Sequence, residues 1–145
     1  VVYKPGEVKV VVYDTQGNKA GEQTIRTAGK PSAFACDVWT QHDAPCLKAD
    51  GDDLAFVTVS LTDKNGIMIP EADDQLTFEV TGAGTFEAVC NGDATSLEPF
   101  KEPTMKLFKG QLVVIVRGAK QPGTAILKVT DKSRKLSKTI EIKVG

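Results

Sequence analysis

The feature that most constrains this chain is an alternation of apolar and polar residues that recurs along nearly its whole length. In residues 54–63 one face carries Ala55, Val57, Val59 and Leu61. Residues two apart share a face in an extended strand, whereas a helix repeats every 3.6 residues. Because the helical period is almost absent, the alternation predicts an all-β protein.

The alternating runs are short and are separated by turn-forming residues. They cover residues 7–14, 22–27, 32–40, 54–63, 75–80, 84–90, 105–118, 123–131 and 136–144. Asn65 and Gly66 follow one run, and both residues adopt positive φ at low cost. About nine such strands are typical of an immunoglobulin-like antiparallel β-sandwich. The run at 105–118 is apolar on both faces from Leu112 to Val116, which predicts a place in the middle of a sheet.

The first two runs stand apart from the rest. Residues 28–31, Ala-Gly-Lys-Pro, interrupt the alternation and indicate a linker. A hairpin alone is marginally stable in water, whereas the seven runs from 32 to 144 suffice for a sandwich. We therefore expect residues 1–28 to be the closing hairpin of a preceding immunoglobulin-like domain and residues 29–145 to be a C-terminal sandwich domain. The alternative is a hairpin that adds to the sheet that follows.

Charge and hydropathy exclude two classes of partner. The 145 residues carry a net charge of −1, so no broad basic field attracts nucleic acid or anionic lipid. No apolar run approaches the ~20 residues of a membrane-spanning helix. With no initiator methionine or signal peptide visible at Val1, we expect a piece of a longer protein or a mature one.

Residues 41–46, QHDAPC, hold the one arrangement that suggests a nucleophile and its base. They place His42, the only histidine, near Asp43 and Cys46. No nucleophile elbow accompanies them, so we expect a polar loop and no catalytic residue.

The three cysteines, Cys36, Cys46 and Cys90, have no metal-binding spacing. A disulfide between Cys36 and Cys46 and three buried free thiols both remain open.

Carboxylates gather in two segments between the expected strands. They are Asp50, Asp52 and Asp53, and then Glu71, Asp73 and Asp74. Neither segment has the twelve-residue pattern of a calcium-binding loop, so we expect solvated turn acids and no metal. Nothing indicates two carboxyl groups facing each other across a cleft, as a glycosidase needs. We expect no cofactor.

Trp39 is the one candidate contact residue. It falls on the opposite face of its strand from Phe34, which aligns with the core, so it is expected to point outward. An exposed tryptophan serves either as a platform for a sugar ring or as a contact for a neighbouring domain.

Two segments resemble parts of family 2 glycoside hydrolases. Residues 3–29 resemble the closing hairpin of the immunoglobulin-like domain that follows the catalytic barrel, especially in bacterial β-galactosidases. Residues 47–101, with KADGDDLAFVTVSLTDKNG, PEADDQLTFEVTGAG and NGDATSLEPFK, resemble the extra C-terminal immunoglobulin-like domain. The strand FKGQLVVIV extends the likeness. Residues 34–46, FACDVWTQHDAPC, depart from the pattern.

The resemblance implies a non-catalytic accessory domain. The parent enzyme would hydrolyse β-galactosides with two glutamates on its barrel, outside this chain. The domain would pack against the rest of the enzyme, space it from a surface, or shape the substrate cleft. A periplasmic, cell-surface or secreted location fits such parents. The alternatives are an immunoglobulin-like repeat of a bacterial adhesin or invasin and an autonomous carbohydrate-binding module.

Overall fold

The computed structural model describes residues 4–41 and 44–145, and these residues form ten β-strands and no α-helix. None of them forms a helix long and apolar enough to span a membrane. The strands are β1 (Glu7–Tyr13), β2 (Lys19–Arg26), β3 (Ala33–Thr40), β4 (Leu54–Thr62), β5 (Gln75–Gly82), β6 (Gly84–Cys90), β7 (Thr104–Lys106), β8 (Gln111–Gly118), β9 (Gly123–Asp131) and β10 (Leu136–Val144).

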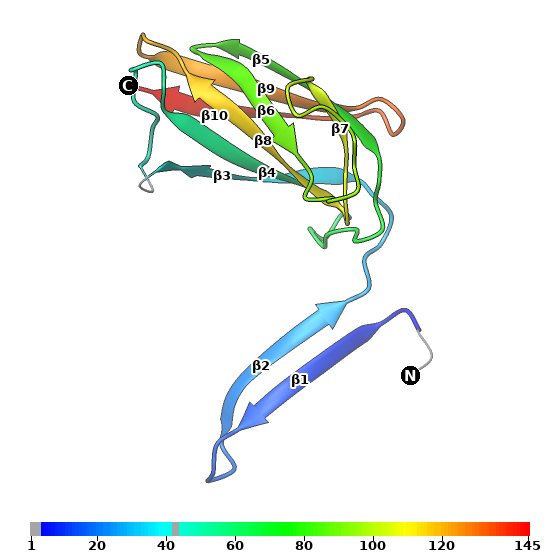
Figure 1. Ribbon diagram of the computed structural model, residues 1–145. Coiled ribbons are helices and arrows are strands. Elements are labelled where there is room, and N and C mark those ends of the chain that lie inside the picture. The colour runs from blue at the N-terminus through cyan, green and yellow to red at the C-terminus, as the bar shows by residue number, and fades with distance from the viewer. Residues whose placement is uncertain (1–3, 42–43) are drawn as a thin grey trace.

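Eight of these strands form two packed antiparallel sheets, shown in Figure 1. One sheet has the order β3-β4-β8-β6 and the other the order β10-β9-β5-β7. Sequential neighbours such as β6 and β7 lie in different sheets, as in an immunoglobulin-like sandwich. The predicted all-β fold is confirmed. The predicted position of residues 112–116 in the middle of a sheet is confirmed too, because β8 lies between β4 and β6.

The sandwich has one strand more than expected because the run at 105–118 is not a single strand. β7 ends at Lys106, and β8 begins at Gln111 in the opposite sheet. Between them Lys109 and Gly110 have φ values of 53° and 81°. Two consecutive residues with positive φ reverse the chain, and the hydrophobic alternation does not register this turn.

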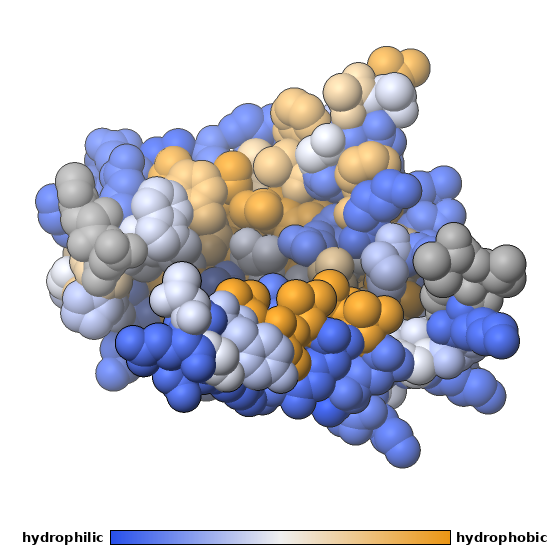
Figure 2. Space-filling view, turned by 90° about the horizontal axis from the view of Figure 1, so that it is seen from below, coloured by the Kyte–Doolittle hydropathy of each residue, from blue (hydrophilic) through white to orange (hydrophobic). Residues whose placement is uncertain are grey.

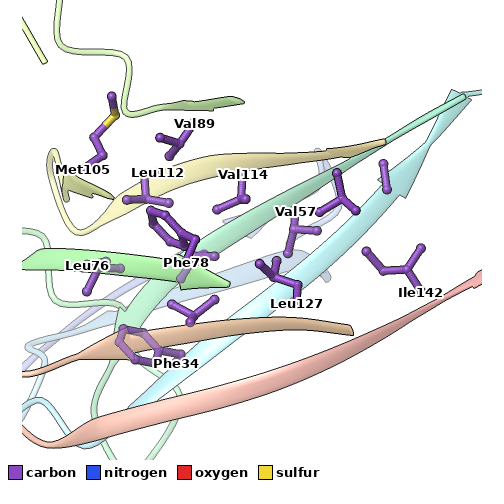
Figure 3. Packing of buried hydrophobic residues seen from close by; sticks show 14 of the residues in the cluster. Phe34, Val57, Leu76, Phe78, Val89, Met105, Leu112, Val114, Leu127 and Ile142 are labelled. Carbon is purple, nitrogen blue, oxygen red and sulfur yellow. The ribbon is translucent and has the colours of Figure 1, made fainter. Parts of the chain in front are cut away.

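The core lies between the two sheets, and Figure 3 shows its packing. Inward-facing side chains from both sheets meet there, as the alternation predicts. Val57 and Val114 come from one sheet, and Leu76 and Leu127 from the other; all four are fully buried. Phe78 stacks on Phe86 across the sheets, with ring centroids 6.4 Å apart.

β1 and β2 form a separate two-stranded hairpin that projects from the sandwich (Figure 1). Glu7 pairs with Arg26 at its base, beside the sandwich, and the turn lies at the far end. The backbone N–H groups of Gln16 and Asn18 each donate to the Asp14 carboxylate at 2.8 Å. This tight turn lets β2 begin at Lys19, three residues before the strand that the sequence predicts.

The linker between hairpin and sandwich is held at two points. The Gly29 N–H donates to Asp63 Oδ2 at 2.8 Å, and the Ser32 N–H donates to the Thr62 carbonyl at 2.9 Å. The other carboxylate oxygen of Asp63 accepts the N–H groups of Asn65 and Ile67. These backbone N–H donors, that of Gly29 first, lower the pKa of Asp63. One carboxylate thus ties the linker to the turn after β4.

Candidate interaction surface

Trp39 lies on the outer face of the sheet β3-β4-β8-β6, with half of its surface exposed. It is on the edge strand β3, whose Phe34 is buried on the inner face. Its ring contacts that of Phe56, with centroids 5.2 Å apart and planes tilted by 46°. Aromatic pairs in this geometry stabilise each other beyond the area that they bury.

A row of apolar side chains continues from Trp39 across all four strands. The register places Phe56 opposite Trp39 on β4, and Ile115 opposite Phe56 on β8. Ala88 on β6 lies opposite Ile115. Phe56, Ile115 and Ala88 are half-buried. We call the row Trp39, Phe56, Ile115 and Ala88 the aromatic patch.

The outer face of the other sheet is different. On β5, β9 and β10, all of whose residues the structure describes, Ile126 is the one large apolar side chain facing outward. Its neighbours on that face are Thr77, Glu79, Thr81, Thr124, Lys128, Thr130, Thr139, Glu141 and Lys143. Outer faces of an antiparallel sandwich are normally solvated and polar. The aromatic patch therefore makes the outer face of the sheet β3-β4-β8-β6 unusual for a sandwich.

Arg117 borders the aromatic patch and joins it to a cluster of charges. A β-bulge in β6 between Phe86 and Ala88 leaves Glu87 unpaired in the ladder, within reach of Arg117. Arg117 Nε donates to Glu87 Oε2 at 2.9 Å, and Lys101 Nζ donates to the other oxygen. Arg117 Nη1 also lies 3.3 Å from Asp52 Oδ1. The hydrogen bonds from Arg117 and then Lys101 lower the pKa of Glu87 to about 2.

The Glu87 cluster should contribute stability that disappears in acid. Because the pKa of Glu87 falls from 4.5 to about 2 on folding, its contribution is complete above pH 4.5 and is lost as the pH falls towards about 2. We expect Glu87→Gln to lower the free energy of unfolding by about 1 kcal/mol at neutral pH. Urea unfolding measures the difference in free energy of unfolding between the two proteins. This difference should disappear as the pH falls through about 2. A difference that stays constant with pH would contradict the assignment.

The two predicted acidic segments are engaged in turns and ion pairs. The Asp50 carboxylate accepts the N–H groups of Asp52 and Asp53, and Asp74 pairs with Arg134 at 2.9 Å. Asp53 is buried, so its description as a solvated turn acid is wrong. Its two oxygens accept the N–H groups of Lys48 and Leu54, which is what makes its burial tolerable. Among the described residues no three His, Cys, Asp or Glu side chains form a group able to hold a metal ion.

A shallow cavity of about 430 Å³ lies beside the long connection between β6 and β7. Its lining includes Asp73, Asp93 and Glu98. Asp93 accepts the hydroxyl and the N–H of Thr95, and Glu98 accepts the amide of Gln75 and the N–H of Lys106. These two carboxylates hold the backbone and side chains around them, so their role in the cavity is structural.

The remaining sequence candidates are the histidine loop and the three cysteines, of which Cys36 lies on β3 and Cys90 at the end of β6. His42 and Asp43 lie outside the described residues, so the interpretation of that loop stays a prediction. Cys36, Cys46 and Cys90 are free thiols in the structure. Burial raises the pKa of Cys36, which keeps that thiol protonated and poorly reactive at neutral pH.

The hairpin carries a second apolar surface. Val8, Val10, Val12 and Ile25 share one face and are 56–67% exposed. The opposite face carries Val11 and is otherwise mainly polar, with ion pairs Glu7–Arg26 and Lys9–Glu22, both at 2.6 Å. In Figure 2 hydrophobic side chains line one flank of the hairpin in the foreground. We call Val8, Val10, Val12 and Ile25 the hairpin face.

Comparison with known proteins decides the family. Residues 40–140, most of the sandwich, match glycoside hydrolase family 2 C-terminal domain 5. The chain belongs to this family. This family 2 C-terminal domain is also 38% identical over 132 residues to beta-galactosidase BoGH2A of Bacteroides ovatus. The matched region is 91% of this chain and 15% of that protein.

Solved structures extend the likeness to the whole chain. A glycosyl hydrolase family 2 member from Bacteroides cellulosilyticus superposes with a TM-score of 0.90 and 30% identity, over 100% of this chain and 18% of that one. A beta-glycosidase from Bacteroides vulgatus gives a TM-score of 0.86 with 28% identity, over 99% and 18%. The family 2 C-terminal domain thus spans less than a fifth of the length of these relatives.

Sequence reasoning found Trp39 but missed the rest of the aromatic patch. The signal was present, because Phe56 and Ile115 are apolar residues on the faces of β4 and β8 that point away from the core. A buried strand in the middle of a sheet explains such residues equally well, so only the register shows that they join Trp39.

Proposed function

We propose that this chain is a non-catalytic C-terminal accessory domain of a secreted β-galactosidase-type glycoside hydrolase, here called the parent enzyme. Its role is to pack against other domains, to space the parent enzyme from a surface, or to shape the substrate cleft. One observation carries the proposal: a family 2 C-terminal domain that matches only 15% of a beta-galactosidase from Bacteroides ovatus. Catalysis then belongs to the remaining part of the parent enzyme.

The chemistry of the described residues supports a non-catalytic role. Asp50, Asp53 and Glu98 accept backbone N–H groups, and Glu87 and Asp74 are paired with arginines. A carboxylate held in this way is poorly suited to giving and taking protons near neutral pH. On this proposal the two catalytic glutamates lie on a barrel of the parent enzyme, outside this chain.

The hairpin supports the proposed domain division. Residues 1–28 would close a sheet of the preceding immunoglobulin-like domain, and residues 29–145 form the accessory domain. The exposed hairpin face is the supporting observation, because four large apolar side chains on a two-stranded ribbon need a partner. The partners of this chain would therefore be other domains of the parent enzyme, in the periplasm, at the cell surface or outside the cell.

Truncation of the parent enzyme tests this proposal. Removing residues 29–145 while keeping residues 1–28 should leave kcat for a chromogenic β-galactoside within about tenfold, because no reacting group is lost. The purified 145-residue chain should show no turnover. Turnover that stays with the purified chain would overturn the non-catalytic assignment.

A second truncation provides the matched control. Removing residues 1–145 also takes away the hairpin, so the preceding sheet loses its closing strands. We expect this parent enzyme to unfold at a lower temperature than the one that keeps residues 1–28. Equal melting temperatures of the two truncated enzymes would contradict the domain division and leave the non-catalytic assignment standing.

Carbohydrate binding is a second candidate, favoured by the half-exposed indole of Trp39. It requires galactoside binding at millimolar or better affinity in calorimetry, with loss on Trp39→Ala. The family match favours a glycosidase parent over an adhesin or invasin repeat, and a barrel encoded upstream distinguishes the two.

A further inference from the structure

We propose that a single domain of the parent enzyme, the one immediately ahead of this chain, covers both the hairpin face and the aromatic patch. The inference rests on the proposed function, which already assigns the hairpin to that preceding domain. What it adds is a second contact, made by the outer face of the sheet β3-β4-β8-β6.

The first support is that hydrophobic side chains of the hairpin and of the sandwich are seen from the same side of the molecule. Figure 2, seen from below, shows hydrophobic side chains along the hairpin in the foreground and a second group further back on the sandwich, with a hollow between them. The hairpin face belongs to β1 and β2, and the aromatic patch lies on the outer face of the sheet β3-β4-β8-β6. One body seated in this hollow would reach both.

The path of the chain places the preceding domain at this hollow. Glu7 pairs with Arg26, and Gly6 and Thr27 exchange two hydrogen bonds of 2.9 and 3.0 Å. The polypeptide therefore reaches the hairpin at its base, close to the sandwich (Figure 1). Because the family is described as a C-terminal domain, we expect most of the parent enzyme to precede this chain.

The fixed position of the hairpin is a further support. The TM-score of 0.90 over the whole chain requires the hairpin to superpose along with the sandwich, since residues 1–28 are about a fifth of the 145. The hydrogen bonds of Gly29 and Ser32 hold the linker, and contacts along the ribbon itself would keep the two strands in one orientation. The same arrangement in a protein more than five times longer is expected if the neighbouring domain fills the hollow.

The chemistry of the aromatic patch fits a protein partner better than a sugar. Its centre combines aromatic and aliphatic side chains, and the charged residues Arg117 and Glu87 lie at its border. Apolar centres with a polar rim, enriched in aromatic residues and arginine, characterise protein interfaces. A sugar platform needs free donors and acceptors around the ring, and here Phe56 and Ile115 follow Trp39 along the row.

Cysteine labelling in the full-length parent enzyme tests the inference. Four variants are compared by peptide mass spectrometry after maleimide treatment: Val10→Cys with its control Val11→Cys, and Ile115→Cys with its control Ile126→Cys. Each control has the same original residue type on the opposite face of its hairpin or sandwich. Ile115 is half-buried in the chain alone and Ile126 is 36% exposed, so each rate is compared with that of the same variant in the isolated 145-residue chain. We expect labelling at positions 10 and 115 to be about tenfold or more slower in the parent enzyme than in that chain, and labelling at positions 11 and 126 to be the same in both.

The outcomes separate this inference from the proposed function. Slow labelling at position 10 with fast labelling at 115 would overturn the shared contact and leave the hairpin assignment intact. Fast labelling at both positions would overturn the shared contact and also the assignment of the hairpin to the preceding domain. Protection at 115 that disappears on dilution would identify a second copy as the occupant. Protection that requires added galactoside would identify a sugar. Either result overturns the inference.

Discussion

Replacing Leu127 with alanine should lower the free energy of unfolding by about 3 kcal/mol. Leu127 is fully buried on β9, between β10 and β5, and faces the opposite sheet in the middle of the core (Figure 3). The change removes apolar contacts and leaves a cavity that two hydrogen-bonded neighbouring strands cannot close. Urea unfolding of the 145-residue chain, with the slope held common to both proteins, measures the loss.

The matched control is Ile126→Ala, one residue earlier on the same strand. Ile126 points outward and is 36% exposed, so its truncation should cost less than about 1 kcal/mol. Equal losses for the two variants would mean that the inner and outer faces of β9 are assigned wrongly. That result would also remove Ile126 as a control for the labelling of position 115.

The face of each strand could be predicted because the alternation is a local property. Ala55, Val57, Val59 and Leu61 were expected on one face, and all four are fully buried. Side chains alternate with a period of two in every strand, whichever strands lie beside it. The sequence therefore predicts which residues enter a core without knowing which strands form it.

The candidate surface could not be predicted in the same way, because it depends on partners distant in the chain. Trp39, Phe56, Ala88 and Ile115 become one row only through the order β3-β4-β8-β6 and its register. Shifting β8 by one residue would turn Ile115 into the core and Val114 outward. Trp39 alone was identified, because the outward face of β3 follows from Phe34 within the same strand.

The misread segment at 105–118 shows the opposite failure, in which a local pattern hid a turn. Residues 105–108, Met-Lys-Leu-Phe, continue the alternation up to the Lys109–Gly110 reversal. Glycine in a strand pattern signals a turn or a close backbone approach, and both apply here. The Gly110 N–H donates to the Ala72 carbonyl at 3.1 Å, and its own carbonyl accepts the Leu61 N–H at 3.0 Å.

Gly110→Ala should therefore be among the most damaging single substitutions in the chain, costing about 2–5 kcal/mol. Its φ of 81° costs an L-residue about 1–2 kcal/mol. An added Cβ would also lie 2.2 Å from the Ile69 carbonyl oxygen. Relieving such overpacking costs a further ~1–3 kcal/mol. Loss of the urea transition, or a midpoint far below that of the unaltered chain, is the expected result.

Gly66→Ala separates the two causes. Gly66 has nearly the same φ, 77°, but an added Cβ would meet no atom within 4 Å. The loss of stability in this variant, about 1–2 kcal/mol, measures the backbone strain alone. The difference between the variants then measures the clash with Ile69, which cannot move without disturbing its own hydrogen bond to Leu61. If both variants lose the same stability, the 69–72 segment yields freely, and the turn that separates β7 from β8 is held by conformation rather than by packing.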